Sequence, residues 1–433
     1  MNNLVNFKVK NYRSFYEETI FSMQATANKE FSELNTFLCN EKLFPKSENE
    51  LLKTAVIFGA NASGKTNLVK ALDFMRLVVL TSANPINPFV QNNTPFAFFS
   101  SSETEPTLFE IEIISKDIFY DYGFEITNKQ ITKEFLKKRP NGRLVEVFSR
   151  NYLGVDLNLS SKNKSSRIGN ISNQSLFISF ANTPFLALDD EIVKDLRNVL
   201  EWFAEPNLYI INDRIMNKYK IYQEDNGKYA ELALNFIKQA DIGVEKFSVV
   251  QEKIGNRNEI LEVKGKHPPQ LMPVDQELLG LDLKTEFNIF DNEHKVVGTK
   301  EIYLERDYGF HSDGTYRLLS ILGLILQILD KGGVIVIDEI DSKLNFLIVD
   351  YIFKAFNSIN SNVNNAQLIS TAHNVLLMDE DLRRDQIYFA SKNKYGATDL
   401  YSLADFNDVR KTDLFSKKYL SGFYSAIPNI KGV

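Results

Sequence analysis

Hydrophobic and polar residues follow one another along this chain in patterns that predict both strands and helices. Two short runs are apolar throughout, as expected for parallel strands buried on both faces: 55–58 and 334–337. Alternation of apolar and polar residues predicts a strand with one solvent face at 4–10 and antiparallel strands at 108–113, 118–126, 131–136 and 144–148. Helical spacing of apolar residues predicts helices at 67–75, 191–203, 229–240 and 316–329. The chain is therefore expected to be an α/β protein with a mixed sheet.

Other segments carry weaker patterns. Short strand-like pieces lie at 21–25, 208–211, 244–250, 259–264 and 367–370. Polar or proline-containing stretches predict irregular connections at 26–50, 82–102, 159–174 and 265–300. No sustained heptad pattern stands out, so a long coiled-coil arm is not expected.

One stretch carries the strongest chemical signal. It fits the pattern G-x-x-x-x-G-K-[ST] at every fixed position, and its residues are Gly59, Ala60, Asn61, Ala62, Ser63, Gly64, Lys65 and Thr66. Its backbone N–H groups would point at phosphate oxygens, at the positive end of a helix that Asn67 continues. Lys65 would neutralise the outer phosphates, and the Thr66 hydroxyl would bind Mg²⁺.

The alternative for this stretch is a chance glycine turn ahead of an ordinary helix. The flanks argue against it, because an apolar strand pattern precedes the loop and a helical pattern follows it. The stretch therefore predicts binding of a nucleoside triphosphate.

An acidic pair ends the second apolar run. Asp338 and Glu339 follow four aliphatic residues, at the carboxyl end of a strand, where α/β sheets bind ligands. Asp338 is expected to hold Mg²⁺ through a water, and Glu339 to orient and deprotonate the attacking water. Two carboxylates in a solvated turn are the alternative, which the strand leading directly into them disfavours.

Two further groups become candidates beside this pair. His373 follows the strand-like piece 367–370, and its imidazole can donate to a γ-phosphate or to the attacking water; alone, it would more often be a packed or surface histidine. Ser312, Asp313 and Gly314 form a turn ahead of a helix. Ser312 would cap that helix, and such a turn also presents N–H groups and a hydroxyl to an anion.

Composition narrows the class of protein. The 433 residues include 50 basic and 56 acidic residues, for a net charge of −6, so no global basic field attracts nucleic acid. The single cysteine, Cys39, excludes an internal disulfide framework and a cysteine-based zinc site, and four histidines disfavour a histidine-rich metal site. No secretory signal is recognised, and no apolar stretch is long enough to span a bilayer. We expect a cytoplasmic protein without a membrane partner.

The order of these pieces resembles the ABC-type ATPases of the SMC and RecF-like branch. Residues 4–15 resemble the first strand of that group and its Asn-[Phe/Tyr]-Arg-Ser-Phe segment. Residues 59–67 match its phosphate loop, and 311–315 resemble its signature turn. Residues 338–341 match its acidic strand end and D-loop.

This resemblance implies an ATPase with ATP and Mg²⁺ as its ligands. It assigns Asp341 to the D-loop and makes His373 the switch histidine. It also implies that Arg13 helps to clamp the nucleotide, although a lone arginine is by default a solvated surface residue.

Segments near the end of the chain narrow the resemblance. Residues 382–389, 396–403 and 418–428 look like bacterial ATPases of phage-defence loci: abortive-infection ATPases, RloA-like proteins and the ATPase subunit of PARIS-type systems. There are departures from the branch, since Asp313 and Thr315 stand where glycine and glutamine are common. Gln91 is the nearest candidate for the Q-loop glutamine, and no Toprim nuclease domain is recognised.

On this resemblance, residues 1–150 form the N-terminal part of an ABC/SMC-like ATPase domain, 151–300 an inserted α+β lobe and 301–433 the C-terminal part. The signature turn of such ATPases cannot reach the phosphates held by its own loop. A homodimer or higher homo-oligomer is therefore implied, in which Ser312 and Gly314 of one copy close over ATP held by the other.

Three classes of function remain open. The compact lobe and the missing nuclease domain favour the ATPase sensor or scaffold of an anti-phage system that controls a separate effector, a nuclease or a toxin. A RecF-like repair or recombination ATPase that binds DNA directly is the alternative, which the acidic net charge mildly disfavours. The nucleotide-binding subunit of a transporter fits poorly with the inserted strands.

Overall fold

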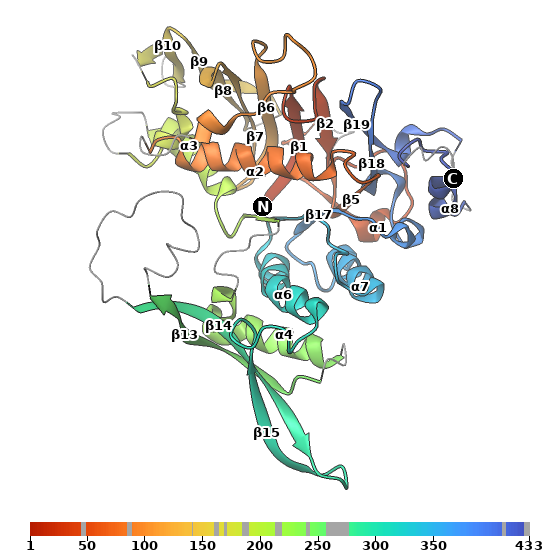
Figure 1. Ribbon diagram of the computed structural model, residues 1–433. Helices are drawn as coiled ribbons and strands as arrows, with labels where there is room; N and C mark the ends of the chain where they lie inside the picture. Colours follow the sequence, from red (N-terminus) through yellow and green to blue (C-terminus); the bar gives the residue numbers. More distant parts are fainter. Residues whose placement is uncertain are drawn as a thin grey trace. The chain divides into compact units, whose positions relative to one another are not determined.

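The computed structural model describes residues 1–44, 49–84, 89–140, 142–159, 164–168, 171–183, 190–212, 219–239, 243–256, 277–408 and 413–427. Its contacts divide the chain into two units, whose elements are labelled in Figure 1. The first unit consists of Met1–Asp213, Ile328–Ser342 and Val349–Val433. The second consists of Arg214–Gln327 and Lys343–Ile348.

An antiparallel sheet of eight strands forms one part of the first unit, in the order β11-β10-β9-β8-β7-β6-β1-β2. The strands are β1 (Asn2–Lys10), β2 (Thr19–Ser22), β6 (Thr107–Ser115), β7 (Ile118–Thr127), β8 (Gln130–Arg139), β9 (Val145–Asn151), β10 (Gly154–Leu159) and β11 (Lys164–Ile168). Buried and half-buried residues alternate along most of β1 and β6, which is the alternation that the sequence shows. The predicted antiparallel strands are thereby confirmed.

A second sheet of the same unit has six strands in the order β12-β16-β17-β5-β18-β19. They are β5 (Thr54–Phe58), β12 (Leu208–Ile211), β16 (Val334–Ile337), β17 (Gln367–Thr371), β18 (Ile387–Lys392) and β19 (Thr398–Ser402). Only the β18–β19 pair is antiparallel, so the sheet is mixed, as predicted. Every residue of β5, β16 and β17 is buried, which explains the largely apolar sequences of β5 and β16.

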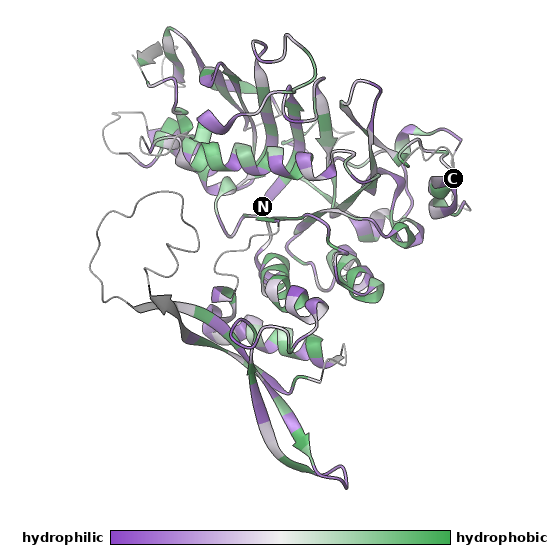
Figure 2. Ribbon diagram, in the orientation of Figure 1, coloured by the Kyte–Doolittle hydropathy of each residue, from purple (hydrophilic) through white to green (hydrophobic). Residues whose placement is uncertain are grey.

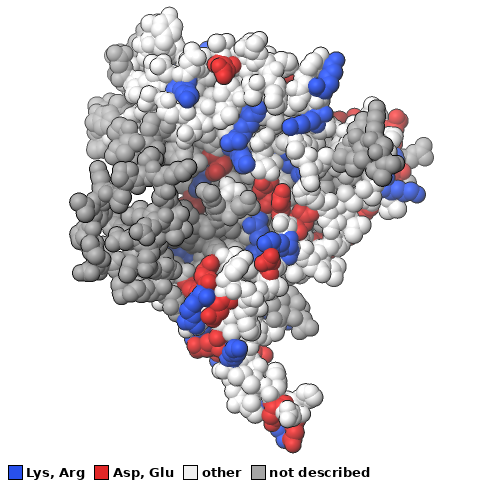
Figure 3. Space-filling model, in the orientation of Figure 1, with Lys and Arg blue, Asp and Glu red and all other residues white. Residues whose placement is uncertain are grey.

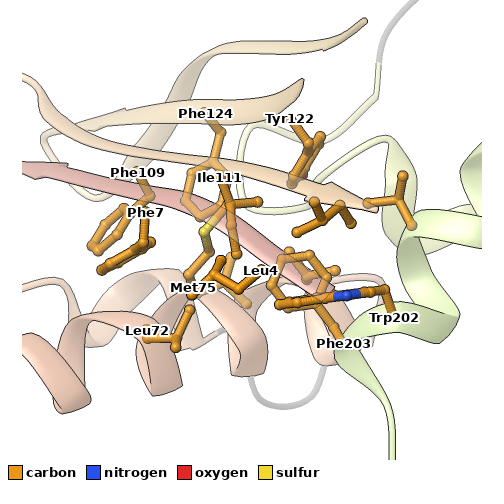
Figure 4. Packing of buried hydrophobic residues seen from close by; sticks show 14 of the residues in the cluster. Leu4, Phe7, Leu72, Met75, Phe109, Ile111, Tyr122, Phe124, Trp202 and Phe203 are labelled. Atoms are coloured by element: carbon orange, nitrogen blue, oxygen red, sulfur yellow. The ribbon is translucent and has the colours of Figure 1, made fainter. Parts of the chain in front are cut away.

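Helix α2 (Lys65–Thr81) joins the cores of the two sheets. Figure 4 shows Leu72 and Met75 of this helix beneath Leu4, Phe7 and Phe109 of the eight-stranded sheet. The same buried cluster contains apolar residues of β5, β16 and β17. Hydrophobic and hydrophilic residues both occur along α2 (Figure 2). The helix that follows the glycine loop is therefore anchored along its length.

Besides short 3-10 helices, the described residues of the first unit form a few further helices and strands, all but one of them short. They are α1 (Ser32–Asn35), the paired strands β3 (Thr36–Leu38) and β4 (Glu50–Leu52), α3 (Asp190–Phe203) and α8 (Phe415–Leu420). Trp202 and Phe203 of α3 are fully buried against the eight-stranded sheet (Figure 4). Helix α7 (Phe346–Asn357) begins in the second unit and continues in the first. None of the helices in the described ranges has the length and apolar character that crossing a membrane requires.

The second unit contains an antiparallel sheet in the order β13-β14-β15, with β13 (Lys246–Asn256), β14 (Glu277–Phe290) and β15 (Val296–Tyr303). Helix α4 (Lys228–Gln239) lies in this unit, and α6 (Asp313–Lys331) begins in it. At the turn between β14 and β15, four apolar side chains are exposed: Ile289, Phe290, Val296 and Val297.

Three predicted loops are wrong, since they contain helices or strands. Residues 26–50 contain α1, β3 and the first residue of β4. Residues 265–300 contain β14 and part of β15. These strands were missed because the buried residues of β14 include the polar Asp282 and Thr285, and most of β15 is exposed, so apolar and polar residues do not alternate regularly. Residues 159–174 contain β11, a polar edge strand. The strand predicted at 259–264 lies outside the described residues.

The two units also begin and end at residues other than those expected for the domains. Residues 151–213 belong to the first unit, since β10 pairs with β9 and β12 pairs with β16. The second unit therefore starts after β12 and not at residue 151.

Candidate functional site

The glycine loop (residues 59–66) connects β5 to α2, as its sequence predicts. Gly64 precedes the first residue of α2 and has φ of +113°, a left-handed conformation that favours glycine. A Cβ on Gly64 would overlap Thr398 Oγ1 and lie 2.9 Å from Ser14 Oγ. The backbone can therefore adopt this curl only with glycine at position 64.

A cavity of about 670 Å³ opens over the loop. It is lined by Asn61, Ala62, Ser63, Gly64, Lys65, Thr66, Asn67, Glu339, His373 and Lys392. The structure thus brings most of the predicted loop residues together with one residue of the acidic pair and the histidine. Within the described part of the chain, the buried Ser63 hydroxyl has no hydrogen-bond partner, so a phosphate oxygen at this loop would satisfy it.

The Lys65 side chain folds over the loop. Its Nζ donates to Gly59 O at 2.7 Å and to Ala60 O at 3.2 Å. Burial lowers the pKa of Lys65 below the ordinary lysine value, while the carboxylates of Glu339 and Asp338 act to raise this pKa. A bound phosphate would act in the same direction as these carboxylates, favouring the charged ammonium.

Thr371, the last residue of β17, organises the acidic pair. Its Oγ1 donates to Asp338 Oδ1 at 2.6 Å and accepts the N–H of Glu339 at 2.7 Å. Thr66 Oγ1 donates to the same Asp338 Oδ1 at 3.3 Å. One carboxylate oxygen is therefore held between the glycine loop and β17.

Glu339 and His373 meet at the cavity wall. Glu339 has φ of +50°, an uncommon conformation for this residue type, and its Oε1 lies 3.7 Å from His373 Nε2. Asp341 Oδ2 accepts the N–H groups of His373 at 2.7 Å and Asn374 at 2.5 Å. Asp341 thus connects the segment after β16 to the segment after β17.

The chemistry of these donors fits Mg²⁺ together with a phosphate. Thr66 and Asp338 offer hard oxygen ligands on adjacent elements. Among the described residues, no group of three or more His, Cys, Asp and Glu side chains could hold a metal ion. Mg²⁺ is commonly bound through one or two carboxylates plus substrate phosphates and water, so a small protein ligand set suits it.

Two other candidates lie apart from this cavity. Arg13 is exposed, and its Nε donates to Tyr12 Oη at 3.2 Å; it is not among the residues that line the cavity. Gln91 Nε2 donates to Lys129 O at 3.4 Å, next to a strand turn of the eight-stranded sheet. The nucleotide roles of both residues remain predictions.

The signature turn lies in the second unit. Ser312 Oγ accepts the N–H of Thr315 at 3.1 Å, so this hydroxyl caps α6, as the simpler interpretation of the sequence predicts. Asp313 forms an ion pair with Lys343 at 2.9 Å. A Cβ on Gly314 would lie 2.5 Å from Lys343 O, so glycine is required there by close backbone contact.

Four residues near the loop were not singled out from the sequence. Lys392 lines the cavity, and Thr371 holds the acidic pair. The hydroxyls of Ser14 and Thr398 are hydrogen-bonded at 2.8 Å, and Thr398 Oγ1 donates to Ser63 O at 2.8 Å. Thr371 lies two positions before the predicted histidine, and Ser14 and Thr398 lie within the segments 4–15 and 396–403 that carry the family resemblance, but none of the three was assigned a role from the sequence.

The sequence from residue 55 to residue 379 matches the family described as "AAA domain, putative AbiEii toxin, Type IV TA system". The chain belongs to this family of AAA domains. It is accordingly a nucleotide-binding domain of ATPase type.

Solved structures of Smc heads are similar at low sequence identity. An Smc head bound to the C-terminal winged-helix domain of ScpA has 12% identity and a TM-score of 0.40, covering 92% of this chain and 97% of that chain. An Smc head with an extended coiled coil, bound to the C-terminal domain of ScpA and derived from Pyrococcus furiosus, has 12% identity and a TM-score of 0.39, covering 98% and 100%. A Pyrococcus yayanosii Smc head with a coiled coil and joint has 10% identity and a TM-score of 0.42, covering 97% and 100%. No curated protein matches the chain.

Proposed function

We propose that this AAA domain hydrolyses ATP, that ATP joins two copies of it, and that the joined state controls a separate effector in an abortive-infection defence. The observation that carries the first part is a single cavity shared by the glycine loop, Glu339 and His373. A phosphate-binding loop and a carboxylate beside a histidine are groups suited to hydrolysis of the β–γ phosphoanhydride bond of ATP by water.

The loop residues bind the triphosphate in this proposal. Backbone N–H groups at the N-terminus of α2 donate to phosphate oxygens, and Lys65 neutralises their charge. Ser63 supplies the buried hydroxyl that lacks a partner within the described residues. Thr66 and Asp338 would hold Mg²⁺, which when bound neutralises charge on the phosphate oxygens.

The hydrolysis step is carried out by Glu339 together with His373. Glu339 accepts a proton from the water whose oxygen attacks the γ-phosphorus, and the bond to the β–γ bridging oxygen breaks to release ADP. His373, within 3.7 Å of Glu339, donates a hydrogen bond to that water or to the γ-phosphate. Thr371 fixes both acids through its one hydroxyl.

Pairing of two copies follows from the signature turn. Ser312 and Asp313 are exposed at the start of α6, where backbone N–H groups and a hydroxyl are available to an anion. In the pair, Ser312 and Gly314 of one copy cover the nucleotide held by Lys65 and Thr66 of the other. The γ-phosphate would then favour the closed pair, and hydrolysis would release it.

A role in defence is supported by the family description, which names a putative AbiEii toxin and a type IV toxin–antitoxin system. We assign toxicity to a separate protein, a nuclease or a toxin, whose release depends on the nucleotide state of this ATPase. An activity of the chain alone as the toxin is the competing possibility, and the experiment below separates the two.

The experiment compares the wild type with Glu339→Gln, Lys65→Ala and a matched surface control, Glu103→Gln. We expect Glu339→Gln to bind ATP but to lose about 100-fold or more in kcat, because the catalytic base is gone. In size-exclusion chromatography with ATP it should remain a dimer, whereas Lys65→Ala should bind no nucleotide. Hydrolysis by Glu339→Gln at the wild-type rate would remove Glu339 from the mechanism.

The same variants test the effector when each is expressed with its neighbouring gene. A partner that co-purifies with the ATPase, and growth arrest only when that partner is present, would support a separate effector. Arrest caused by the ATPase alone would make this chain the toxin.

A further inference from the structure

The glycine loop has a neighbouring strand on each side in the six-stranded sheet, and only one side carries residues to which a chemical role has been given. Strand β5, which leads into the loop, lies between β17 and β18. Asp338, Glu339 and His373 follow β16 and β17, on one side of β5. Lys392 is the last residue of β18, on the other side, and lines the same cavity.

The backbone of β18 is held close to the loop. Phe389 pairs with Phe58, the last residue of β5, and β18 continues to Lys392 beyond that pair. A Cβ on Gly59 would overlap the carbonyl oxygen of Ala390, so no gap separates the two segments. The position from which the Lys392 side chain starts is therefore set by contact with the glycine loop.

Strand β19, which pairs with β18, also holds the backbone of Lys392 in place beside the glycine loop. Lys392 pairs with Thr398 in the β18–β19 register. Thr398 Oγ1 donates to Ser63 O at 2.8 Å, and Thr398 N donates to Ser14 O at 2.7 Å. The hairpin and the glycine loop are thus one hydrogen-bonded assembly, and Lys392 moves with the loop.

The Lys392 ammonium is available to a ligand. Lys392 is exposed, and within the described residues no carboxylate forms an ion pair with it. The neighbouring Lys394 is different, because its Nζ lies 4.8 Å from the centre of the Tyr395 ring and it does not line the cavity. A polyphosphate in the cavity would therefore face two lysines. Lys65 lies in the glycine loop, and Lys392 lies on the side of β5 opposite the acidic residues.

We propose that Lys392 is a second phosphate-binding lysine, which contacts the part of the phosphate chain that ATP and ADP share. This inference rests on the proposed function. The γ-phosphate must lie near Glu339 and His373 for hydrolysis, so a cation on the opposite side of the loop faces the phosphates nearer the ribose. Lys392 binds nucleotide and leaves the chemical step to the other wall.

The test measures the Kd of ADP and ATP, and steady-state hydrolysis, for Lys392→Ala, Lys392→Arg and the control Lys394→Ala. Lys392→Ala should raise both Kd values by the same factor of about ten, because one charge-assisted hydrogen bond is lost. Its KM should rise similarly while kcat stays within about twofold. Lys392→Arg should retain most of the affinity, and Lys394→Ala should match the wild type.

An unchanged ADP affinity in Lys392→Ala would overturn the inference, and so would a fall in kcat without loss of affinity. Circular dichroism and the Tm of each variant separate lost binding from lost folding, and a correctly folded Lys392→Arg with poor ADP binding would also count against it. If the wild type itself binds no ATP, the proposed function fails. If the wild type binds ATP and ADP and Lys392→Ala binds both equally well, the proposed function stands and only the inference about Lys392 is wrong.

Discussion

At the residue scale, a single hydroxyl has more influence on the acidic pair than its place in the sequence indicates. Thr371 is fully buried, and its Oγ1 connects the side chain of Asp338 to the backbone N–H of Glu339. Glu339 has a positive φ, which non-glycine residues adopt at a cost of roughly 1–3 kcal/mol when surrounding contacts enforce it. The hydrogen bond from Glu339 N to Thr371 is one such contact.

Replacement of Thr371 by valine preserves shape and removes this hydroxyl. We expect the Thr371→Val variant to lose about 10- to 100-fold in activity or in apparent Mg²⁺ affinity, the range typical for groups that orient metal ligands. The measurement is ATP hydrolysis as a function of Mg²⁺ concentration. Thr371→Ser, which keeps the hydroxyl, is the control and should remain near wild type. If Thr371→Val and Thr371→Ser lost equal amounts of activity, the effect would come from altered packing and not from the missing hydroxyl.

Several site residues could be predicted from the sequence because they belong to contiguous motifs. The glycine loop and the acidic pair are each one short segment that follows a buried strand, and the structure places both at the same sheet edge. Lys392 and Thr398 have no such signal. They reach the loop only because β18 lies next to β5, and strand order is set by long-range packing that no local pattern reports.

At the element scale, the β18–β19 hairpin supports the glycine loop from the side opposite the acids. Thr398 is buried and bonds to Ser63 O, while Asn67 Nδ2 donates to Ser14 Oγ at 2.8 Å. Ser14 and Thr398 are themselves hydrogen-bonded. Three segments distant in sequence therefore converge beneath the start of α2, which limits how far the loop can move.

The Thr398→Val variant tests this support. It removes the hydroxyl that donates to Ser63 O and leaves the Ser14 hydroxyl with only its bond from Asn67 Nδ2, so the free energy of unfolding should fall by about 1–3 kcal/mol. Urea unfolding is the measurement, with Thr398→Ser as the variant that retains the bond. Because the loop loses a contact, KM for ATP should rise more than kcat falls. A stability loss with unchanged KM would restrict Thr398 to a role in folding.

A buried face made most of the predicted elements recognisable, although helix α7 and strand β18 also have buried residues and were not predicted. The strands of the eight-stranded sheet show clear alternation because α2 and α3 cover one side of that sheet. Strands β14 and β15 extend into solvent at their turn, where apolar residues such as Phe290 and Val297 are exposed. No burial pattern distinguishes such a hairpin from a polar loop.

At the scale of the whole molecule, the first unit is assembled from three separate stretches of sequence. Strand β12 arrives long before β16 in the chain, yet the two pair in parallel along their full length. The division expected from the family resemblance assigned β12 to the inserted lobe, because the next recognisable ATPase segments appear only later in the sequence. On the face drawn in Figure 3, acidic and basic side chains are interspersed, in keeping with a net charge of only −6.

If each nucleotide site is built from residues of two copies, mixing two inactive variants should restore ATP hydrolysis for some pairs of variants and not for others. In the proposed pair, each nucleotide contacts Lys65 and Glu339 of one copy and Ser312 of the other. Mixing Lys65→Ala with Ser312→Arg should therefore restore activity, since a mixed dimer has one complete site. With random pairing about half the dimers are mixed, so about one quarter of wild-type activity is expected.

A second mixture provides the control for this prediction. Lys65 and Glu339 act on the same nucleotide from the same copy, so mixing Lys65→Ala with Glu339→Gln leaves both sites of every mixed dimer incomplete and should restore nothing. ATP hydrolysis of each mixture, compared with the sum of its two components, is the measurement. Ser312→Arg also removes the cap of α6, at a cost of about 1 kcal/mol, so its Tm must be measured first. If folded Ser312→Arg and Lys65→Ala fail to complement, the serine of the signature turn does not complete a neighbour's site, and the two-copy switch must be abandoned even if each copy binds ATP.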